Sequence, residues 1–267
     1  MLKLYRRRLR QLQHRCVRQV SRLLANSSFT QDRIREIFGV EAPVCRYGVD
    51  LNQFRPSPAV RRGSHVLSVG ELSPRKGFAF LVESLALVPA PERPTLRIAC
   101  NSEIPQERRY VEQLAKARNV SLEIRSKLNT DELAREYRQA ALCVYAPIDE
   151  PFGLVPLEAM ACGTAVVGVR EGGVAESVVH EQTGLLVRRD LRAFADATRY
   201  LLSASEVRAE YGWNGREHVV AHWSWDRSVA DLERHLAYVA DCERRERGTS
   251  RANDIEAVAI PDERTIG

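Results

Sequence analysis

Two glutamates, Glu150 and Glu158, are the residues whose type and spacing most clearly suggest chemistry; seven mostly apolar residues separate them. Pro156 lies between them, and proline is tolerated in the first turn of a helix because an N–H there has no partner within the helix. We therefore expect a helix to begin near Gly153 or Leu154, with Glu150 outside its amino end. At 1.5 Å per residue, Glu158 then lies roughly 6 Å inside this helix.

The amino end of this expected helix is suited to binding an anion. Its unpaired backbone N–H groups and the helix dipole favour phosphate oxygens. Carboxylates only accept hydrogen bonds, so Glu158 is suited to two hydroxyls of a ribose and Glu150 to a sugar beyond the phosphate. A simpler interpretation is that Glu150 complements the helix dipole, but this does not explain an acid between Leu157 and Ala159.

The other candidate loop is residues 70–77. We call it the first loop, because it precedes the loop that carries Glu150, which we call the second loop. The first loop begins at Gly70, ends on another glycine and carries the adjacent cations Arg75 and Lys76. Such a loop can bring positive charge against a diphosphate. Basic turns are common on protein surfaces, so an ordinary solvated loop is an equal alternative for this segment.

The two loops belong to a regular alternation of elements that starts at residue 65. Short apolar segments predict strands near 66–69, 96–100, 120–124, 142–146, 165–169 and 185–187. Helical patterns of about ten residues separate them, one of them opened by a capping-box pair, Asn129 and Glu132. This order predicts an α/β fold with a Rossmann-like, doubly wound parallel sheet, followed by C-terminal helices. Ligands of such sheets bind beyond the carboxyl ends of the strands, where both candidate loops lie.

Composition excludes several other classes of protein. With 44% hydrophobic and 28% charged residues among 267, the chain is typical of globular proteins. No apolar run reaches the roughly 20 residues that span a bilayer, and no secretory signal is recognisable, so we expect a cytoplasmic protein. The six cysteines form no C-x-x-C pair, and there is no G-x-G-x-x-G; we expect no metal, no cofactor and no simple NAD enzyme.

The N-terminal segment is basic and amphipathic. Residues 1–22 carry eight of the basic residues and no acid, and subtracting these eight charges from the net +5 leaves −3 for the remainder. The basic excess therefore lies outside the fold, which argues against a nucleic-acid partner. Apolar residues recur at spacings of three and four, at Leu2, Tyr5, Leu9, Leu12, Cys16, Val20 and Leu23. This pattern predicts a helix that either packs on protein or contacts anionic lipid on the inner face of the membrane.

The segment that contains both glutamates resembles a known family. Glu150 and Glu158 are followed by Ala-Met-Ala-Cys-Gly-Thr-Ala-Val-Val at 159–167 and by Gly-Gly-Val-Ala-Glu at 172–176, which is similar to the retaining GT-B glycosyltransferases (glycosyl transferases group 1). Roughly residues 25–240 are covered. Further matching segments are 25–30, 48–50, 70–77 and 223–225.

This resemblance implies a role for each candidate residue. Lys76 would contact the diphosphate of the donor, Glu150 the donor sugar and Glu158 the ribose. Donor-binding positions also include Gly70 and Arg75 in the first loop, the backbone amides of Phe152, Gly153 and Leu154, and, for the base, the backbone near Arg125 to Lys127.

Three positions depart from the family pattern. Glu71 stands where many members have an arginine, which removes one phosphate cation, and Arg75 is a candidate replacement. Tyr47 stands where asparagine is usual and Ala165 where proline is usual.

The resemblance also implies a division of the chain into domains. Residues 1–50 would be a remnant of an acceptor domain (basic helix, helix and strand), 51–64 a linker, 65–223 the donor-binding domain, 224–244 a C-terminal helix and 245–267 a disordered tail. The implied function is transfer of a hexosyl group from a UDP- or GDP-sugar to an unknown acceptor with retention of configuration, by a chain that holds mainly the donor-binding half. An alternative is a non-catalytic nucleotide-sugar-binding module that needs a partner, either a separate acceptor-domain chain or a second copy.

Overall fold

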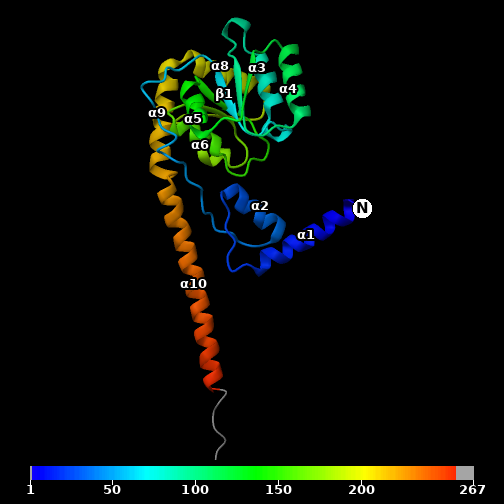
Figure 1. The fold of residues 1–267 in the computed structure, drawn as a ribbon, viewed down its shortest axis with the longest axis vertical. Helices are drawn as coiled ribbons and strands as arrows, with labels where there is room; N and C mark the ends of the chain where they lie inside the picture. Colours follow the sequence, from blue (N-terminus) through cyan, green and yellow to red (C-terminus); the bar gives the residue numbers. More distant parts are fainter. Residues whose placement is uncertain (1, 257–267) are drawn as a thin grey trace, which may run out of the picture. The chain divides into compact units, whose positions relative to one another are not determined.

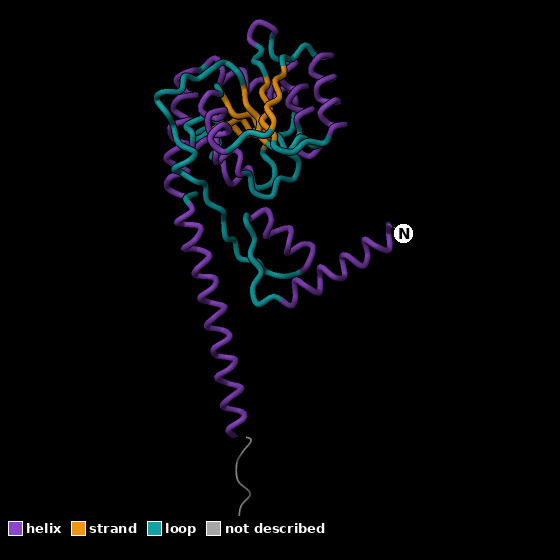
Figure 2. The backbone as a smooth tube through the Cα atoms, in the orientation of Figure 1, coloured by secondary structure: helices purple, strands orange, loops and turns teal. Residues whose placement is uncertain are grey.

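The computed structural model describes residues 2–256, with side chains for residues 4–245. The chain divides into two units: Leu24–Ser228 forms one, and the described parts of Met1–Leu23 and Val229–Gly267 form the other. The larger unit contains a central sheet with helices on both of its faces (Figures 1 and 2).

All strands of this sheet are parallel. They are β1 (Val66–Val69), β2 (Leu96–Cys100), β3 (Leu122–Ser126), β4 (Leu142–Tyr145), β5 (Val166–Val169) and β6 (Gly184–Val187), in the spatial order β3-β2-β1-β4-β5-β6. Val66 of β1 is in register with Leu96 on one side and Leu142 on the other. The strand order reverses between the neighbouring strands β1 and β4, and ligands of doubly wound sheets bind at such a switch point. The predicted doubly wound parallel sheet is confirmed.

Two layers of helices cover the sheet. They are α3 (Phe78–Ala86), α4 (Pro105–Ala117), α5 (Thr130–Gln139), α6 (Leu154–Ala161), α7 (Val174–Ser177), α8 (Leu191–Ser203) and α9 (Ser205–His222). Side chains of α3, α4 and α8 share one hydrophobic cluster, and those of α5, α6 and α9 share the other. Alternate strand residues belong to alternate clusters: Leu142 and Val144 to the first, Cys143 and Tyr145 to the second. Both faces of the strands are therefore apolar, as parallel sheets require.

The starts of α6 and α5 follow from the residues that precede them. Gly153 precedes α6 with a left-handed φ of 92°, and Pro156 occupies the first turn as predicted. The amide of Glu132 donates to Asn129 Oδ1 (2.9 Å), and the Glu132 carboxylate accepts from the Asn129 amide (2.8 Å). The predicted capping box at the start of α5 is confirmed.

Residues 51–64, which we expected to be a linker, lie within the larger unit and are hydrogen-bonded to other parts of it. Arg62 donates to the Ala140 carbonyl (3.0 Å) and to Thr164 Oγ1 (2.7 Å), and Arg216 donates to the Phe54 carbonyl (3.0 Å). Proline and glycine content predicted a linker, but arginine side chains bind this segment along its length. The compact unit that contains the sheet includes residues 24–64, and the assignment of 65–223 to donor binding stays a prediction.

The segments before and after the sheet differ in part from the expectation. Helices α1 (Leu2–Gln19) and α2 (Ser28–Phe38) form. The strand expected within residues 1–50 is represented only by isolated bridges, Ala25 to Val44 and Val49 to Ser224. Helix α10 (Trp225–Glu256) continues beyond residue 244 into the segment expected to be disordered, of which 257–267 lie outside the described residues. In the smaller unit the Arg22 guanidinium lies 4.1 Å from the centre of the Tyr238 ring. No described helix is long and apolar enough to cross a membrane.

Candidate functional site

Lys76 and Glu150, from the loops after β1 and β4, meet at the carboxyl edge of the sheet. Lys76 Nζ lies 2.7 Å from Glu150 Oε2, and the two side chains are 26% and 16% exposed. They are separated by 74 positions in the sequence and meet because β1 and β4 are neighbouring strands in the sheet. The structure thus places a cation and an acid that we predicted separately in one ion pair.

A glycine allows the first loop to lie against the end of β4. Gly77 has a φ of 71°, and a Cβ at this position would lie 2.0 Å from the Ala146 carbonyl oxygen. Only glycine permits both this backbone conformation and this approach. The Ile148 amide also donates to the Arg75 carbonyl (2.8 Å). The two loops are therefore joined through their backbones as well as through the ion pair.

The second loop packs against Gly172 and Gly173, the glycine pair that follows β5. The Gly173 amide donates to the Glu150 carbonyl (2.8 Å), and a Cβ on Gly173 would lie 2.6 Å from Phe152 Cα. Gly172 has a φ of 59°, and its Cβ would lie 2.3 Å from the Glu150 carbonyl oxygen. The family resemblance pointed to these glycines, but the contact that requires them is visible only in the structure.

A pocket of about 250 Å³ lies between the two loops. It is lined by Glu71, Ser73, Arg75, Lys76, Ile148, Asp149, Glu150 and Pro151. Three of the predicted residues, Arg75, Lys76 and Glu150, are among them. Within the described chain the Arg75 side chain is exposed and makes no ion pair, so its charge can serve a ligand.

The backbone at the start of α6 presents N–H groups without partners. Among the described residues, no hydrogen bond uses the amides of Phe152, Gly153 or Leu154. The carbonyls of Phe152 and Gly153 accept from Ser177 Oγ (3.2 and 3.4 Å), which holds this segment from the α7 side. These unpaired donors lie at the helix start where the sequence predicts an anion-binding site, and that role stays a prediction.

Glu158 lies one turn into α6 with a strongly perturbed carboxyl group. Burial raises the pKa of Glu158 to about 7, although a hydrogen bond from the Tyr137 hydroxyl to Oε2 (2.7 Å) opposes the shift. Burial, together with the charge of Glu158, holds the pKa of Tyr137 well above its usual value, so Tyr137 remains a neutral donor. Tyr137 was not predicted as a site residue, because a tyrosine on the apolar face of a helix is typical of the hydrophobic core.

A second pocket, of about 220 Å³, adjoins the first and shares Glu71 with it. Its lining is largely apolar and consists of Val69, Gly70, Glu71, Ala99, Asn101, Ser102, Leu128 and Leu133. Arg125 and Lys127 line neither pocket: Arg125 lies 3.6 Å from Glu123, and the Lys127 amide donates to the Cys100 carbonyl (3.1 Å). Their neighbour Leu128 reaches the pocket instead.

Two aromatic rings enclose Phe152, which is buried. Its ring centre lies 5.3 Å from that of Tyr47 and 5.6 Å from that of Trp223. Tyr47, noted in the sequence as a departure from asparagine, thus has a packing role beside the second loop. Among the residues that the structure describes, no group of three or more His, Cys, Asp or Glu side chains is arranged to hold a metal ion.

Comparison with known proteins places this site in a family. The sequence model described as "Glycosyl transferases group 1" matches residues 51–218. The chain is 34% identical over 196 residues to "Alpha-maltose-1-phosphate synthase" of Mycolicibacterium smegmatis, covering 69% of this chain and 48% of that protein. It is 32% identical over 235 residues to "GDP-mannose-dependent alpha-(1-6)-phosphatidylinositol monomannoside mannosyltransferase" of Mycobacterium tuberculosis, covering 77% and 59%.

A solved structure shows the same fold. Sucrose-phosphate synthase from Thermosynechococcus elongatus superposes with a TM-score of 0.79 at 27% identity, covering 87% of this chain and 62% of that one. The chain spans about half the length of the curated relatives it matches.

Proposed function

Because the chain belongs to the glycosyl transferases group 1 family, we propose that it binds a nucleotide-diphosphate sugar between β1 and β4 and takes part in hexosyl transfer with retention of configuration. The observation that carries this proposal is the Lys76–Glu150 ion pair beside the unpaired amides of α6. The relatives are named as synthases and transferases, one of them GDP-mannose-dependent, which favours transfer over a binding module without turnover.

The first pocket would receive the diphosphate. Lys76 and Arg75 supply positive charge from one loop, and the amides of Phe152, Gly153 and Leu154 supply donors from the other. Charge-assisted hydrogen bonds of this kind are about twice as strong as neutral ones. Lys76 is paired with Glu150 in the free protein, so an incoming phosphate would take over the ammonium group and leave the Glu150 carboxylate to accept from sugar hydroxyls.

The nucleoside would extend from the diphosphate toward Glu158 and the second pocket. The Glu158 carboxylate would accept from the ribose hydroxyls while Tyr137 holds its other hydrogen bond. The apolar walls at Leu128 and Leu133 suit the faces of a base, and the backbone near Arg125 to Lys127 would bind its edge. Both UDP- and GDP-sugars fit this description.

Catalysis would consist mainly of electrostatic support for the leaving diphosphate. Lys76 and the α6 amides face the position where negative charge develops, and such preorganised donors lower the barrier. In front-face transfer the leaving phosphate helps to take the proton from the acceptor hydroxyl, so no protein base is required. We propose neither a metal nor a cofactor for this transfer.

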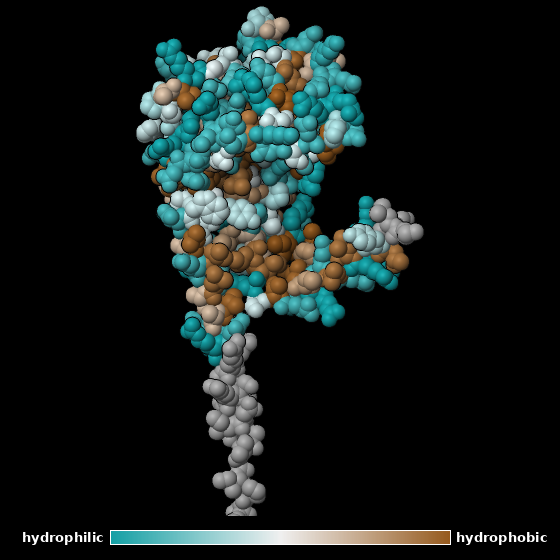
Figure 3. All heavy atoms as spheres, in the orientation of Figure 1, coloured by the Kyte–Doolittle hydropathy of each residue, from teal (hydrophilic) through white to brown (hydrophobic). Residues whose placement is uncertain are grey.

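Helix α1 would contact a surface outside the sheet unit. Its side chains Leu4, Tyr5 and Leu12 are 58%, 64% and 57% exposed, and Figure 3 shows hydrophobic residues in brown along this helix beside hydrophilic ones in teal. The eight basic residues of 1–22 favour an anionic lipid surface on the cytoplasmic side, a peripheral contact. A separate acceptor-domain chain or a second copy of this chain is the alternative partner for the exposed stripe.

A turnover assay tests the proposed function. The protein is incubated with UDP-glucose or GDP-mannose, and release of the nucleoside diphosphate is measured with and without added sugar acceptors. We expect release to depend on Lys76, with Lys76→Ala much slower and Lys116→Ala, an exposed lysine on α4, unchanged. Binding without any release would instead support the non-catalytic alternative.

A further inference from the structure

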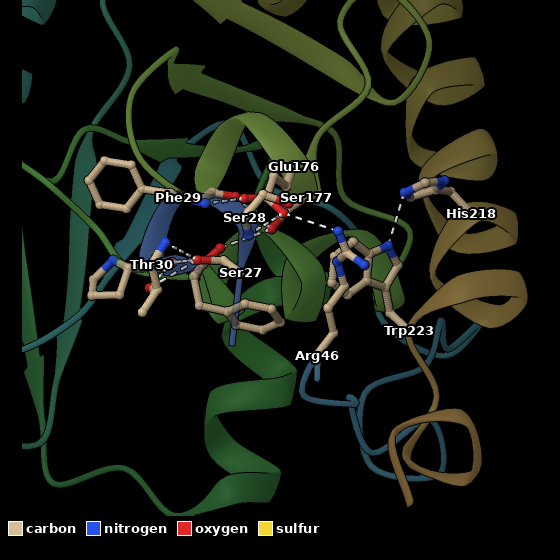
Figure 4. Close-up of polar contacts among 12 residues, drawn as sticks. Ser27, Ser28, Phe29, Thr30, Arg46, Glu176, Ser177, His218 and Trp223 are labelled. Carbon is tan, nitrogen blue, oxygen red and sulfur yellow. Dashed lines mark hydrogen bonds and ion pairs between the residues drawn. The ribbon is translucent and has the colours of Figure 1, made fainter. Parts of the chain in front are cut away.

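The residue that caps α2 is bonded directly to the loop that carries Glu150. Ser27 Oγ accepts from the Thr30 amide (2.9 Å), as an N-cap does, and donates to the carbonyl oxygen of Pro151 (Figure 4). Thr30 Oγ1 donates to the same carbonyl at 3.4 Å. Pro151 stands between Glu150 and Phe152, so the position of α2 and that of this loop depend on each other.

Glu176 of α7 makes a second connection to the same end of α2. Its carboxylate accepts from the amides of Ser28 (3.1 Å) and Phe29 (2.9 Å), and Arg46 Nη2 lies 3.2 Å away (Figure 4). Burial would raise the pKa of Glu176, but the hydrogen bonds from Ser28, Phe29 and Arg46 outweigh it and the pKa is lowered. The group stays ionised at neutral pH and complements the dipole of α2.

Arg46 extends these contacts to the far side of the loop. Its guanidinium lies 5.7 Å from the centre of the Trp223 ring, and that ring packs against Phe152. Trp223 Nε1 in turn donates to His218 Nε2 (3.0 Å), as the dashed line in Figure 4 marks. The loop is therefore held at its Pro151 carbonyl and at its Phe152 ring by one connected group of residues.

We propose that Ser27, Arg46 and Glu176 form a latch that fixes loop 150–154 and so sets the affinity of the site for a nucleotide diphosphate. This rests on the proposed function. None of the three lines either pocket, so they are positioning residues that act through Pro151 and Phe152. Amides at a helix start bind phosphate well only when their direction is fixed beforehand, because ordering a loop on binding reduces affinity.

The test combines two readouts on Ser27→Ala and Glu176→Gln. In the protein without nucleotide, we expect faster exchange of the Gly173 amide, which donates to the Glu150 carbonyl (2.8 Å), and unchanged exchange in peptides of α3. For whichever of UDP, GDP and ADP binds, we expect an affinity about 3- to 10-fold weaker, the size of one lost hydrogen bond. Ser27→Thr, which keeps the hydroxyl, should restore both values.

Matched controls carry the same changes away from the latch. They are Ser203→Ala, whose hydroxyl donates to the Tyr200 carbonyl (2.9 Å), and Glu92→Gln, whose carboxylate pairs with Arg199 (2.6 Å). Should either latch variant fail to fold, Arg46→Lys is the milder change and has to shift exchange in the same direction.

Unchanged exchange of the Gly173 amide in folded latch variants would overturn the latch, whatever nucleotide binding shows. Faster exchange in a protein that binds none of the three nucleotides would support the latch and refute the proposed function. The two ideas therefore fail separately.

Discussion

At the scale of single residues, Glu158 has the most unusual chemistry in the site. A carboxyl group with a pKa of about 7 is half ionised at neutral pH, and its environment contains one neutral hydroxyl donor, Tyr137, rather than a cation. Hydrogen bonds from ribose hydroxyls would stabilise the ionised form more than the protonated form. Binding of a nucleotide and loss of the Glu158 proton should therefore be coupled.

This coupling predicts a pH dependence of donor affinity. We expect the affinity for the nucleotide-sugar that binds to be fully developed above pH 7 and to fall, by up to about tenfold per unit, as the pH decreases below 7. Titration at several pH values measures this directly. A nucleotide-sugar is the correct probe, because a terminal phosphate itself titrates near pH 6.

Glu158→Gln is the control for this profile. The amide does not ionise, so its affinity should be lower above pH 7 and nearly independent of pH. A wild-type profile that matches that of Glu158→Gln would exclude Glu158 as the titrating group.

The raised pKa of Glu158 also predicts a pH dependence of folding stability, opposite in sign to that of nucleotide affinity. The folded pKa of about 7 exceeds the ordinary 4.5, so the folded state holds the proton more tightly than the unfolded state between these values. The free energy of unfolding should therefore fall as the pH rises from about 4.5 to 7, by about 1 to 3 kcal/mol from this group. Urea unfolding of wild type and Glu158→Gln at pH 5 and pH 8 checks it. An equal change in both proteins would contradict this assignment.

Some residues of the candidate site could be predicted from the sequence and others could not, for physical reasons. Glu150, Glu158 and Lys76 stand out because charged residues flank a helix start or a glycine turn. Tyr137 and Ser27 do not, because a tyrosine on an apolar face and a serine before a helix have ordinary structural explanations. Their roles depend on contacts with residues far along the chain: Tyr137 with Glu158, and Ser27 with Pro151 at a separation of 124 positions.

At the scale of elements, Gly77, Gly172 and Gly173 determine how closely the loops approach the neighbouring backbone. Strand and helix order was predictable from periodicity, since alternate apolar residues feed two hydrophobic clusters. The packing of 51–64 and the full extent of α10 were not, because the first depends on arginine hydrogen bonds across the fold. In the sequence, a glycine indicates only that the backbone there needs conformational freedom or a close approach. The structure shows which atoms lie against it.

Gly173→Ala tests whether the close contact between Gly173 and the second loop is required. Its φ is not in the left-handed region, so the effect is steric: the new methyl would meet Phe152 Cα and the Pro151 carbonyl at 2.6 Å. We expect a loss of about 1 to 3 kcal/mol in the free energy of unfolding and weaker nucleotide binding. Gly63→Ala is the control, because its methyl would meet no atom closer than 3.0 Å, the distance to the His65 ring nitrogen Nδ1. Equal effects of the two changes would argue against a special role for Gly173.

At the scale of the whole molecule, the chain spans about half the length of its curated relatives. The predicted assignment of 65–223 to donor binding and of 1–50 to a remnant of an acceptor domain stays a prediction. The structure instead groups residues 24–64 with the sheet. The site described here lies within that one unit, so donor binding can be measured on this chain whatever turnover requires.

The exposed stripe of α1 predicts binding to anionic membranes. We expect the protein to float with vesicles of phosphatidylcholine and phosphatidylserine, and to be released by salt because the contact is electrostatic. Changing Arg6, Arg7 and Arg8 to glutamine should abolish flotation. Absence of flotation would leave a polypeptide partner as the explanation, which sedimentation analysis for dimers would then examine.

Calorimetric titration with UDP, GDP and ADP at pH 8 tests the central claim most directly. We predict that one of them binds in the millimolar to micromolar range and that Glu158→Ala weakens it by roughly 1.5 to 3 kcal/mol, the scale of a hydrogen bond to a charged group. Glu112→Ala, an exposed glutamate on α4, should bind like wild type. Failure of all three nucleotides to bind, or equal affinity in Glu158→Ala, would contradict a nucleotide-sugar site at the start of α6.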